Sequence, residues 1–224
     1  MPATFLFIRH GESTDNVKSV WAGWKDAPLS NHGMNQARAL GQVLASTPLK
    51  AIHSSDLKRA FMTAESVQAC QQATQPLIIP SALLREQHFG VAEGKSYRTQ
   101  RHLGMSLDDH FAQEMYPTIH SRTEKFPEGE STNDLALRAV EAIKGIVLPY
   151  VWDAAQDGSA DSIVAITSHG LFIKEAIAAL IGMDSSGRSS APGVFKGLAN
   201  TGWVRVVIDV VDVRAKASFI AIPR

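Results

Sequence analysis

The sequence has little cysteine and no long apolar run. Its 224 residues include one cysteine, Cys70, which cannot form an internal disulfide. The simplest interpretation is a protein of a reducing compartment, and we expect it in the cytoplasm. No stretch of roughly 18 or more apolar residues occurs, so no transmembrane helix is expected. The first residues contain neither a basic segment nor a long apolar one, which predicts no secretory signal.

Neither sign of charge is in excess. Lysine and arginine together number 22, as do aspartate and glutamate, so the formal net charge at pH 7 is zero. A basic surface that binds nucleic acid or a membrane usually shows in the overall charge. The sequence therefore predicts neither partner, and it predicts that any anion site is local.

Short apolar segments alternate with amphipathic ones along the chain. Strands are predicted at residues 3–9, 49–55, 75–81 and 161–170, and the tail, residues 197–222, reads as two further strands in a hairpin. Helical patterns separate these strands. The alternation predicts an α/β fold, a three-layer α/β/α sandwich with a mostly parallel central sheet.

Capping residues mark where the helices are expected to begin. Ser30 is the predicted N-cap of the first long helix, and Asp56 or Ser55 that of the next. A further helix is predicted over 128–155, with a capping box that starts at Ser131. We expect these helices to cover both faces of the sheet.

The regular alternation stops between about residues 86 and 130. This segment is rich in polar and aromatic residues, and we expect one or two short helices in it. Long irregular excursions in compact domains are often lids or binding loops. The sequence therefore predicts one domain, residues 1–224, with a lid or substrate-specificity insertion at about 95–130.

Two of the predicted strands end in a histidine and a glycine. The first continues as "RHGES", with Arg9 and His10, and the fourth ends in "SHG", with His169. Ligands of parallel sheets bind beyond the carboxyl ends of the strands, so both histidines are expected at one rim. The guanidinium of Arg9 suits a phosphate or carboxylate. The amides of Gly170 and Leu171 begin the following helix, where an anion is favoured.

Two further segments bring charged side chains toward that rim. Arg59 lies in the first turn of a helix that follows a strand, from which it can point toward His10. Glu86 lies just after the third strand, in "LLREQHFG", and Asn16 adds a neutral donor after "RHGES". A solvated arginine and a surface glutamate are the ordinary explanations for such residues taken singly. Their shared placement favours an anion site.

The segments "RHGES", "SSDLKRA", "LREQHFGVAEG" and "SHG" resemble the histidine phosphatase superfamily in identity, order and spacing. These "RHG" proteins include the cofactor-dependent phosphoglycerate mutases. The resemblance covers residues 5 to about 175, and "LANTGWVRV" is similar to the family's closing strand. It implies that His10 is a nucleophile that becomes phosphorylated and that Glu86 is the proton donor. The phosphate pocket that it implies contains Arg9, Arg59, His169 and, in a secondary position, Asn16.

General chemistry agrees with these implied roles. A neutral imidazole is a competent nucleophile, and arginines with a second imidazole stabilise charge on phosphoryl oxygens. The resemblance therefore implies a phosphatase that needs no metal and no cofactor and hydrolyses a small phosphorylated metabolite through phosphohistidine on His10. One alternative is a cofactor-dependent phosphoglycerate mutase. Another is a catalytically silent module that binds a phosphorylated ligand, although a pure binder needs neither a nucleophile nor an acid.

The branch of the family is indicated by smaller features. "SSDLKRAFMTAE" and "TSHGLFIKEA" are similar to the phosphatase branch, which includes fructose-bisphosphatase or TIGAR-like and broad-specificity phosphatases. The paired arginines of the mutases are missing between residues 97 and 130. Two positions depart from the family's pattern. Ala92 stands where many relatives have tryptophan, and Glu128 stands where glycine is common.

Arg98 and Arg101 form a small basic cluster with His102 inside the insertion. We predict that this cluster contacts a second anionic group on the substrate. A solvated face of the lid is the alternative, because exposed basic side chains are common.

Two other patterns carry less weight. "GVAEGKS", residues 90–96, is similar to a nucleotide-binding P-loop, but three residues separate its glycines where the motif needs four. The remaining histidines lack the close spacing of zinc motifs. Neither a nucleotide site nor a metal site is therefore expected.

Overall fold

The central sheet matches the predicted fold class. The computed structural model describes residues 1–224 except 73, 158–162, 185–194, 196, 211–221 and 224. Its strands form a six-stranded sheet in the order β3-β2-β4-β1-β5-β6. The first four strands run parallel, and β5 is antiparallel to β1. The strands are β1 (Ala3–Arg9), β2 (Leu49–Ser55), β3 (Leu77–Ser81), β4 (Ile163–Ser168), β5 (Trp203–Ile208) and β6 (Ile222–Pro223).

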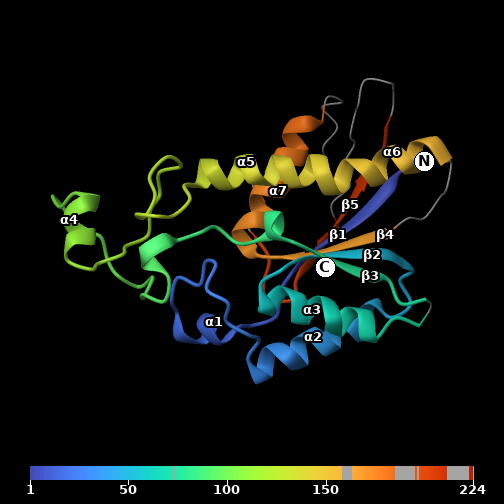
Figure 1. The fold of residues 1–224 in the computed structure, drawn as a ribbon, viewed down its shortest axis with the longest axis horizontal. Coiled ribbons are helices and arrows are strands. Elements are labelled where there is room, and N and C mark those ends of the chain that lie inside the picture. The colour runs from blue at the N-terminus through green and yellow to red at the C-terminus, as the bar shows by residue number, and fades with distance from the viewer. Residues whose placement is uncertain (73, 158–162, 185–194, 196, 211–221, 224) are drawn as a thin grey trace.

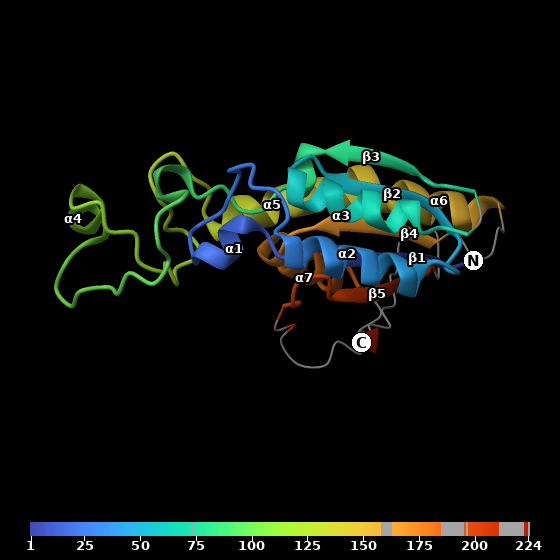
Figure 2. The same ribbon diagram turned by 90° about the horizontal axis from the view of Figure 1, so that it is seen from below.

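Helices cover both faces of the sheet (Figures 1 and 2). One face carries α2 and α3, and the other carries α5, α6 and α7. Strand β1 shows why both faces are covered, because Phe5 and Phe7 belong to one buried cluster and Leu6 and Ile8 to the other. The helices are α1 (Thr14–Lys18), α2 (Asn31–Leu44), α3 (Lys58–Ala69), α4 (Leu107–Ala112), α5 (Thr132–Ala142), α6 (Leu148–Asp157) and α7 (Gly170–Met183). In the described part of the chain, no helix is long and apolar enough to cross a membrane.

The predicted caps are right for α2 and wrong for α3. Ser30 caps α2 by accepting a hydrogen bond from the Gly33 amide. Helix α3 begins after Leu57, which makes no side-chain cap bond. The side chain of Asp56 is engaged elsewhere, because both its oxygens accept from Arg85, at 2.7 and 2.6 Å.

The long helix predicted over residues 128–155 is not one uniform helix. It begins at α5 with the predicted Ser131 capping box. A π-helical turn, Ile143–Val147, then separates α5 from α6. Pro149 explains this interruption, because it has no N–H to donate to the carbonyl four residues earlier.

The predicted C-terminal hairpin is described in part. Strand β5 pairs antiparallel with β6 through Val204–Pro223 and Arg205–Ile222. Residues 217–221 of the second predicted strand lie outside the described residues.

The segment after β3 extends beyond the carboxyl ends of the parallel strands. Figures 1 and 2 show it as an arm with α4 at its far end. The base of the arm has a small core of its own, in which Phe89, Tyr116 and Phe126 are buried beside Trp21. The first residues of this arm and the returning residues before α5 therefore stand next to the strand ends where ligands of such sheets bind.

Candidate active site

The ends of β1 and β4 bring His10 and His169 together. Arg9 is the register partner of Ser168, and the His10 amide donates to the Ser168 carbonyl at 3.0 Å. The two imidazole rings lie 5.0 Å apart between centroids. The predicted meeting of "RHG" and "SHG" at one rim is therefore confirmed.

The ring of His10 is held in one orientation. Its Nδ1 lies 2.6 Å from the Gly11 carbonyl oxygen. Because a carbonyl only accepts, Nδ1 carries the hydrogen and the lone pair of the neutral ring is on Nε2. Burial lowers the pKa of His10 well below its ordinary value, and the positive charges of Arg59 and Arg9 lower it further, although the bond to Gly11 acts in the opposite direction. Both observations favour a neutral imidazole whose Nε2 keeps its lone pair.

Glycine is required directly after His10. A Cβ on Gly11 would lie 2.6 Å from the carbonyl oxygen of Gly33. The Gly11 amide donates to Thr63 Oγ1 at 3.1 Å, and the Thr63 hydroxyl donates to the Arg59 carbonyl at 2.7 Å. These contacts join the strand end to α2 and α3 behind the histidine.

Arg9 and Arg59 are fixed by backbone carbonyls. Arg59, 1% exposed, donates to the carbonyls of Gly23 and Lys25 at 2.7 and 3.0 Å. Arg9 donates to the Leu198 carbonyl at 2.6 Å. Nε of each guanidinium is buried and has no hydrogen-bond partner among the described residues. A buried donor without a partner is costly, so each of these groups is one that a bound anion could stabilise.

His169 completes this group. Its Nε2 lies 2.9 Å from Ser55 Oγ, and its Nδ1 is buried without a hydrogen-bond partner in the described part of the chain. Burial lowers the pKa of His169 well below its ordinary value, and the charges of Arg59 and other cations lower it further. A bound anion would reverse part of that effect and favour protonation of His169.

Glu86 stands at the N-terminus of α7. Its Oε1 accepts from the amides of Gln87 and Phe172 at 3.1 and 3.2 Å, and its Oε2 accepts from the Leu171 amide at 3.3 Å. Burial lowers the pKa of Arg59. Nearby acidic residues oppose this shift, and Glu86 makes the largest opposing contribution. The carboxyl group therefore lies near enough to the Arg59 guanidinium to interact with it electrostatically. In this structure the Leu171 amide bonds to Glu86, and not to an open anion site as the sequence predicted.

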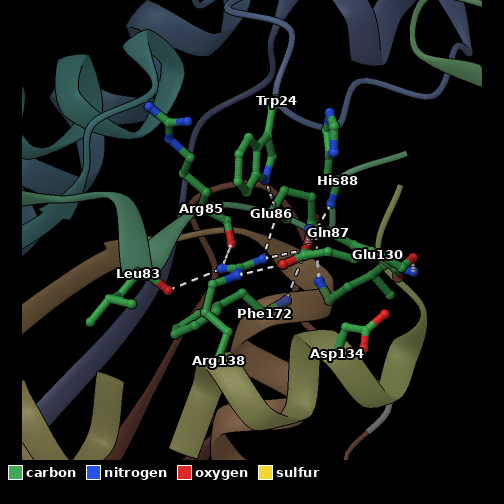
Figure 3. Close-up of polar contacts among 12 residues, drawn as sticks. Trp24, Leu83, Arg85, Glu86, Gln87, His88, Glu130, Asp134, Arg138 and Phe172 are labelled. Atoms are coloured by element: carbon green, nitrogen blue, oxygen red, sulfur yellow. Dashed lines mark hydrogen bonds and ion pairs between the residues drawn. The ribbon is translucent and has the colours of Figure 1, made fainter. Parts of the chain in front are cut away.

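A clamp centred on Arg138 holds the segment that carries Glu86 (Figure 3). Its guanidinium donates to the carbonyls of Leu83, Arg85 and Glu86 at 3.0, 2.7 and 2.9 Å. It also makes a bidentate pair with Glu130, at 2.9 and 2.7 Å. The indole N–H of Trp24 donates to the same Glu86 carbonyl at 2.8 Å. We use "clamp" below for Arg138, Glu130 and Trp24.

Asn16 has a structural partner near His10. Its Oδ1 accepts from the Ser13 amide at 3.0 Å, in the capping box of α1. Asn200 connects Asn16 with His10. Its side-chain amide donates to the His10 carbonyl at 3.0 Å and to Asn16 Oδ1 at 3.4 Å. The predicted phosphate contact of Asn16 stays a prediction.

Arg98 and Arg101 are not brought to the histidines. Both are exposed, in the loop between Gly94 and α4. Their predicted contact with a second anionic group is not tested by this arrangement. The Gly170 amide also keeps its predicted role only as a prediction, although Gly170 does lie against the Arg9 guanidinium.

Several residues of the site have no strong sequence signal. Ser55 and Thr63 lie inside the "SSDLKRAFMT" segment, whose pattern predicts a site role for Arg59 alone. Asn200 lies in the tail segment "LANTG". Arg138 and Glu130 are eight residues apart, so they show no helical pair spacing. Only the path of the loop brings these two residues together.

Metal ligands do not gather in the described residues. No group of three or more histidine, cysteine, aspartate or glutamate side chains there is arranged to hold an ion. The prediction that the reaction needs no metal therefore depends on the experiments below.

Comparisons with known proteins bear on the family of the chain. The family model of the histidine phosphatase superfamily (branch 1) matches residues 5–214. A 2,3-bisphosphoglycerate-dependent phosphoglycerate mutase of Bartonella henselae is 30% identical over 188 residues, which are 83% of this chain and 84% of that protein. A probable phosphatase of Schizosaccharomyces pombe is 28% identical over 212 residues, 92% of this chain and 66% of that protein.

A solved structure shows the same fold. The mycobacterial glucosyl-3-phosphoglycerate phosphatase superimposes with a TM-score of 0.73 at 24% identity, and the match covers 100% of this chain and 98% of that one. This likeness concerns the fold, which includes the mostly parallel sheet.

Proposed function

Since the chain belongs to the histidine phosphatase superfamily and is a phosphatase of that family, we propose that it hydrolyses a small phosphorylated metabolite through phosphohistidine on His10. The observation that carries the proposal is the orientation of His10, whose bond to the Gly11 carbonyl leaves Nε2 free. Arg9, Arg59 and His169 each carry a buried nitrogen that has no hydrogen-bond partner in the described structure, and in our proposal these three side chains surround the phosphoryl group.

The first step transfers the phosphoryl group to His10. A bond forms between Nε2 and phosphorus while the bond from phosphorus to the ester oxygen breaks. Arg9, Arg59 and His169 stabilise the charge on the phosphoryl oxygens. The leaving alkoxide takes a proton from Glu86. Oε2 is the oxygen that carries this proton in the proposal, because it accepts one amide bond where Oε1 accepts two.

The second step removes the phosphoryl group from His10. Glu86, now a carboxylate, accepts a proton from water as the water oxygen attacks phosphorus. The bond from phosphorus to Nε2 breaks, and inorganic phosphate leaves with the imidazole neutral again. Both steps use one carboxyl group, so its position relative to His10 decides the rate of both.

The fate of the phosphoryl group separates a phosphatase from a mutase. Several curated relatives are named as phosphoglycerate mutases, which pass the group to a second hydroxyl. In our proposal water is the acceptor, and residues 95–130 act as the lid that admits the substrate. No metal or cofactor takes part.

A panel of phosphate esters tests this proposal. We expect the wild-type protein to release inorganic phosphate with EDTA present and the His10→Ala variant to release none. Loss of activity on chelation would contradict the metal-independent scheme. Conversion of 3-phosphoglycerate to its 2-phosphate isomer, without release of phosphate from any ester, would identify a mutase instead. Tight binding of esters with no turnover would identify a silent binding module.

A further inference from the structure

A cavity of about 430 Å³ adjoins Glu86 on the side of the insertion. Gln87, the next residue in the chain, forms part of its wall. So does Leu171, whose amide donates to Glu86 Oε2. Residues 118–122 and 124–126 of the insertion also line it. Glu86 is not itself part of the lining, but its contacts with Gln87 and Leu171 place its carboxylate beside the cavity.

The geometry of the proposed reaction indicates which part of the substrate lies toward this cavity. In-line attack by His10 requires the leaving oxygen on the far side of phosphorus from Nε2. The proton donor must lie within hydrogen-bond reach of that oxygen. The alcohol part of the ester therefore extends past Glu86, which is where the cavity begins. Its volume falls within the range of about 300–1,000 Å³ that is usual for sites of small ligands.

The lining of the cavity combines aromatic rings with uncharged polar groups. Trp21, Phe89 and Phe126 supply the rings, and Gln87, Thr118 and Thr132 supply amide and hydroxyl groups. Such a surface suits a ligand with both apolar faces and hydrogen-bonding edges.

The charged groups of the lining are largely balanced. Arg122 makes a bidentate pair with Glu175, at 3.2 and 2.7 Å, and Glu130 is paired with Arg138 in the clamp. Lys125 lies 3.6 Å from Asp134 with about half of its side chain exposed. Lys174 is also exposed to solvent. Among the described residues of the lining, no buried cation lacks a carboxylate.

That balance argues against an anionic alcohol. A carboxylate or a second phosphate inside the cavity would lose its hydration. In return the lining offers only the exposed Lys174 and cations that already contact a carboxylate. Arg98 and Arg101, which the sequence suggested for such a group, are not part of the lining. An uncharged alcohol meets neither obstacle.

We propose that this cavity binds the alcohol part of the substrate, and that this alcohol is an uncharged sugar or polyol. Its C–H faces would pack on the aromatic rings, and its hydroxyl groups would bond to the uncharged polar side chains. This inference rests on the proposed function, because Glu86 sets the direction in which the alcohol lies.

Substrate preference tests the inference. We would compare kcat/KM for glucose 1-phosphate, glucose 6-phosphate and sorbitol 6-phosphate with kcat/KM for 3-phosphoglycerate and fructose 1,6-bisphosphate. At least one of the uncharged alcohols is expected to exceed both anionic ones by tenfold or more. Equal or better turnover of an anionic alcohol would overturn the inference and leave the phosphatase proposal intact. Failure to release phosphate from any ester, p-nitrophenyl phosphate included, would overturn both.

A substitution in the cavity tests its location. Thr118 lines the cavity and is exposed, so Thr118→Trp fills space there with little risk to folding. Acetyl phosphate serves as a reference ester with a small leaving group. The ratio of kcat/KM for the best sugar phosphate to that for acetyl phosphate should fall at least tenfold, mainly through KM. Thr74→Trp, at an exposed threonine before β3, should leave this ratio unchanged. An unchanged ratio in Thr118→Trp would overturn the assignment of the cavity.

Discussion

The floor and the wall of the site are built in different ways. The floor consists of Arg9, His10, Arg59 and His169, which lie at or just after the ends of β1, β2 and β4. The wall consists of Glu86 and the loop around it, which the clamp holds through backbone carbonyls. Sheet geometry places the two histidines of the floor, and backbone carbonyls hold its two arginines. The position of the wall depends on the side chains of the clamp. Damage to each should therefore have a different kinetic signature.

The largest loss of kcat/KM is expected from a substitution in the floor. Arg59→Met removes a donor to the phosphoryl group, so kcat/KM should fall about 10³-fold. Because every substrate presents the same phosphoryl group, p-nitrophenyl phosphate and an alkyl ester such as glycerol 1-phosphate should lose activity by similar factors. Steady-state kinetics with both esters measures this.

Arg59 is also buried on two carbonyls, so its loss will lower stability. Arg9→Met provides a second floor variant with a less buried side chain. A loss confined to the alkyl ester in both variants would contradict the role assigned to the floor.

The wall should respond in the opposite pattern. Arg138→Met releases the Glu86 segment and leaves Glu130 unpaired, which should lower stability by about 3 kcal/mol. The rate with the alkyl ester should fall about 10²-fold, because its leaving group needs the proton from Glu86. The rate with p-nitrophenyl phosphate should fall far less, because p-nitrophenolate leaves without a proton.

Two variants keep this comparison interpretable. Arg138→Lys retains a cation beside Glu130 and should recover part of the alkyl-ester rate. Arg38→Met, at an exposed arginine of α2, should change neither rate. Equal losses with both esters in Arg138→Met would mean that the clamp supports the whole fold and does not position the proton donor.

Acid should lower the free energy of unfolding through the two buried histidines of the floor. Burial lowers the pKa of His10 and of His169 in the folded state. Below about pH 6.5 the unfolded chain binds protons that these folded imidazoles do not. The free energy of unfolding should therefore be highest above about pH 6.5 and fall as pH decreases, by at most about 1.4 kcal/mol per pH unit for each histidine.

Urea unfolding at several pH values, in buffer without phosphate, measures this slope. The double variant His10→Gln and His169→Gln should flatten it, and His32→Gln on the exposed surface of α2 should not. A slope that is unchanged in the double variant would contradict the assignment of neutral, buried imidazoles.

The smallest effect is expected in the wall, at Glu128. This residue has φ of 64°, in the left-handed region that favours glycine. Glu128→Gly should raise the free energy of unfolding by about 0.5–1 kcal/mol, since the strain relieved exceeds the added chain entropy. Glu124→Gly, at a residue whose φ is not positive, should lower it. Destabilisation by Glu128→Gly would show that its side chain contributes more than the strain costs.

The same contrast explains how much of the molecule could be predicted. The floor could be read from the sequence, because "RHG" and "SHG" follow apolar strands and parallel strands end at one edge. Glu128 was also recognised as unusual. The contacts of the clamp could not be predicted from the sequence. Arg138 binds backbone carbonyls, and these are the same for every residue type. The cap of α3 was mispredicted because Asp56 pairs with Arg85.

The central claim is that His10 Nε2 takes the phosphoryl group, and trapping the intermediate tests it most directly. The protein would be mixed with a ³²P-labelled phosphate ester, quenched in alkali within the first turnover, and digested for peptide mapping. We expect label that is stable in alkali and lost in acid, on the peptide that contains His10, and none in His10→Ala. Label on another residue, or undiminished label in His10→Ala, would contradict it.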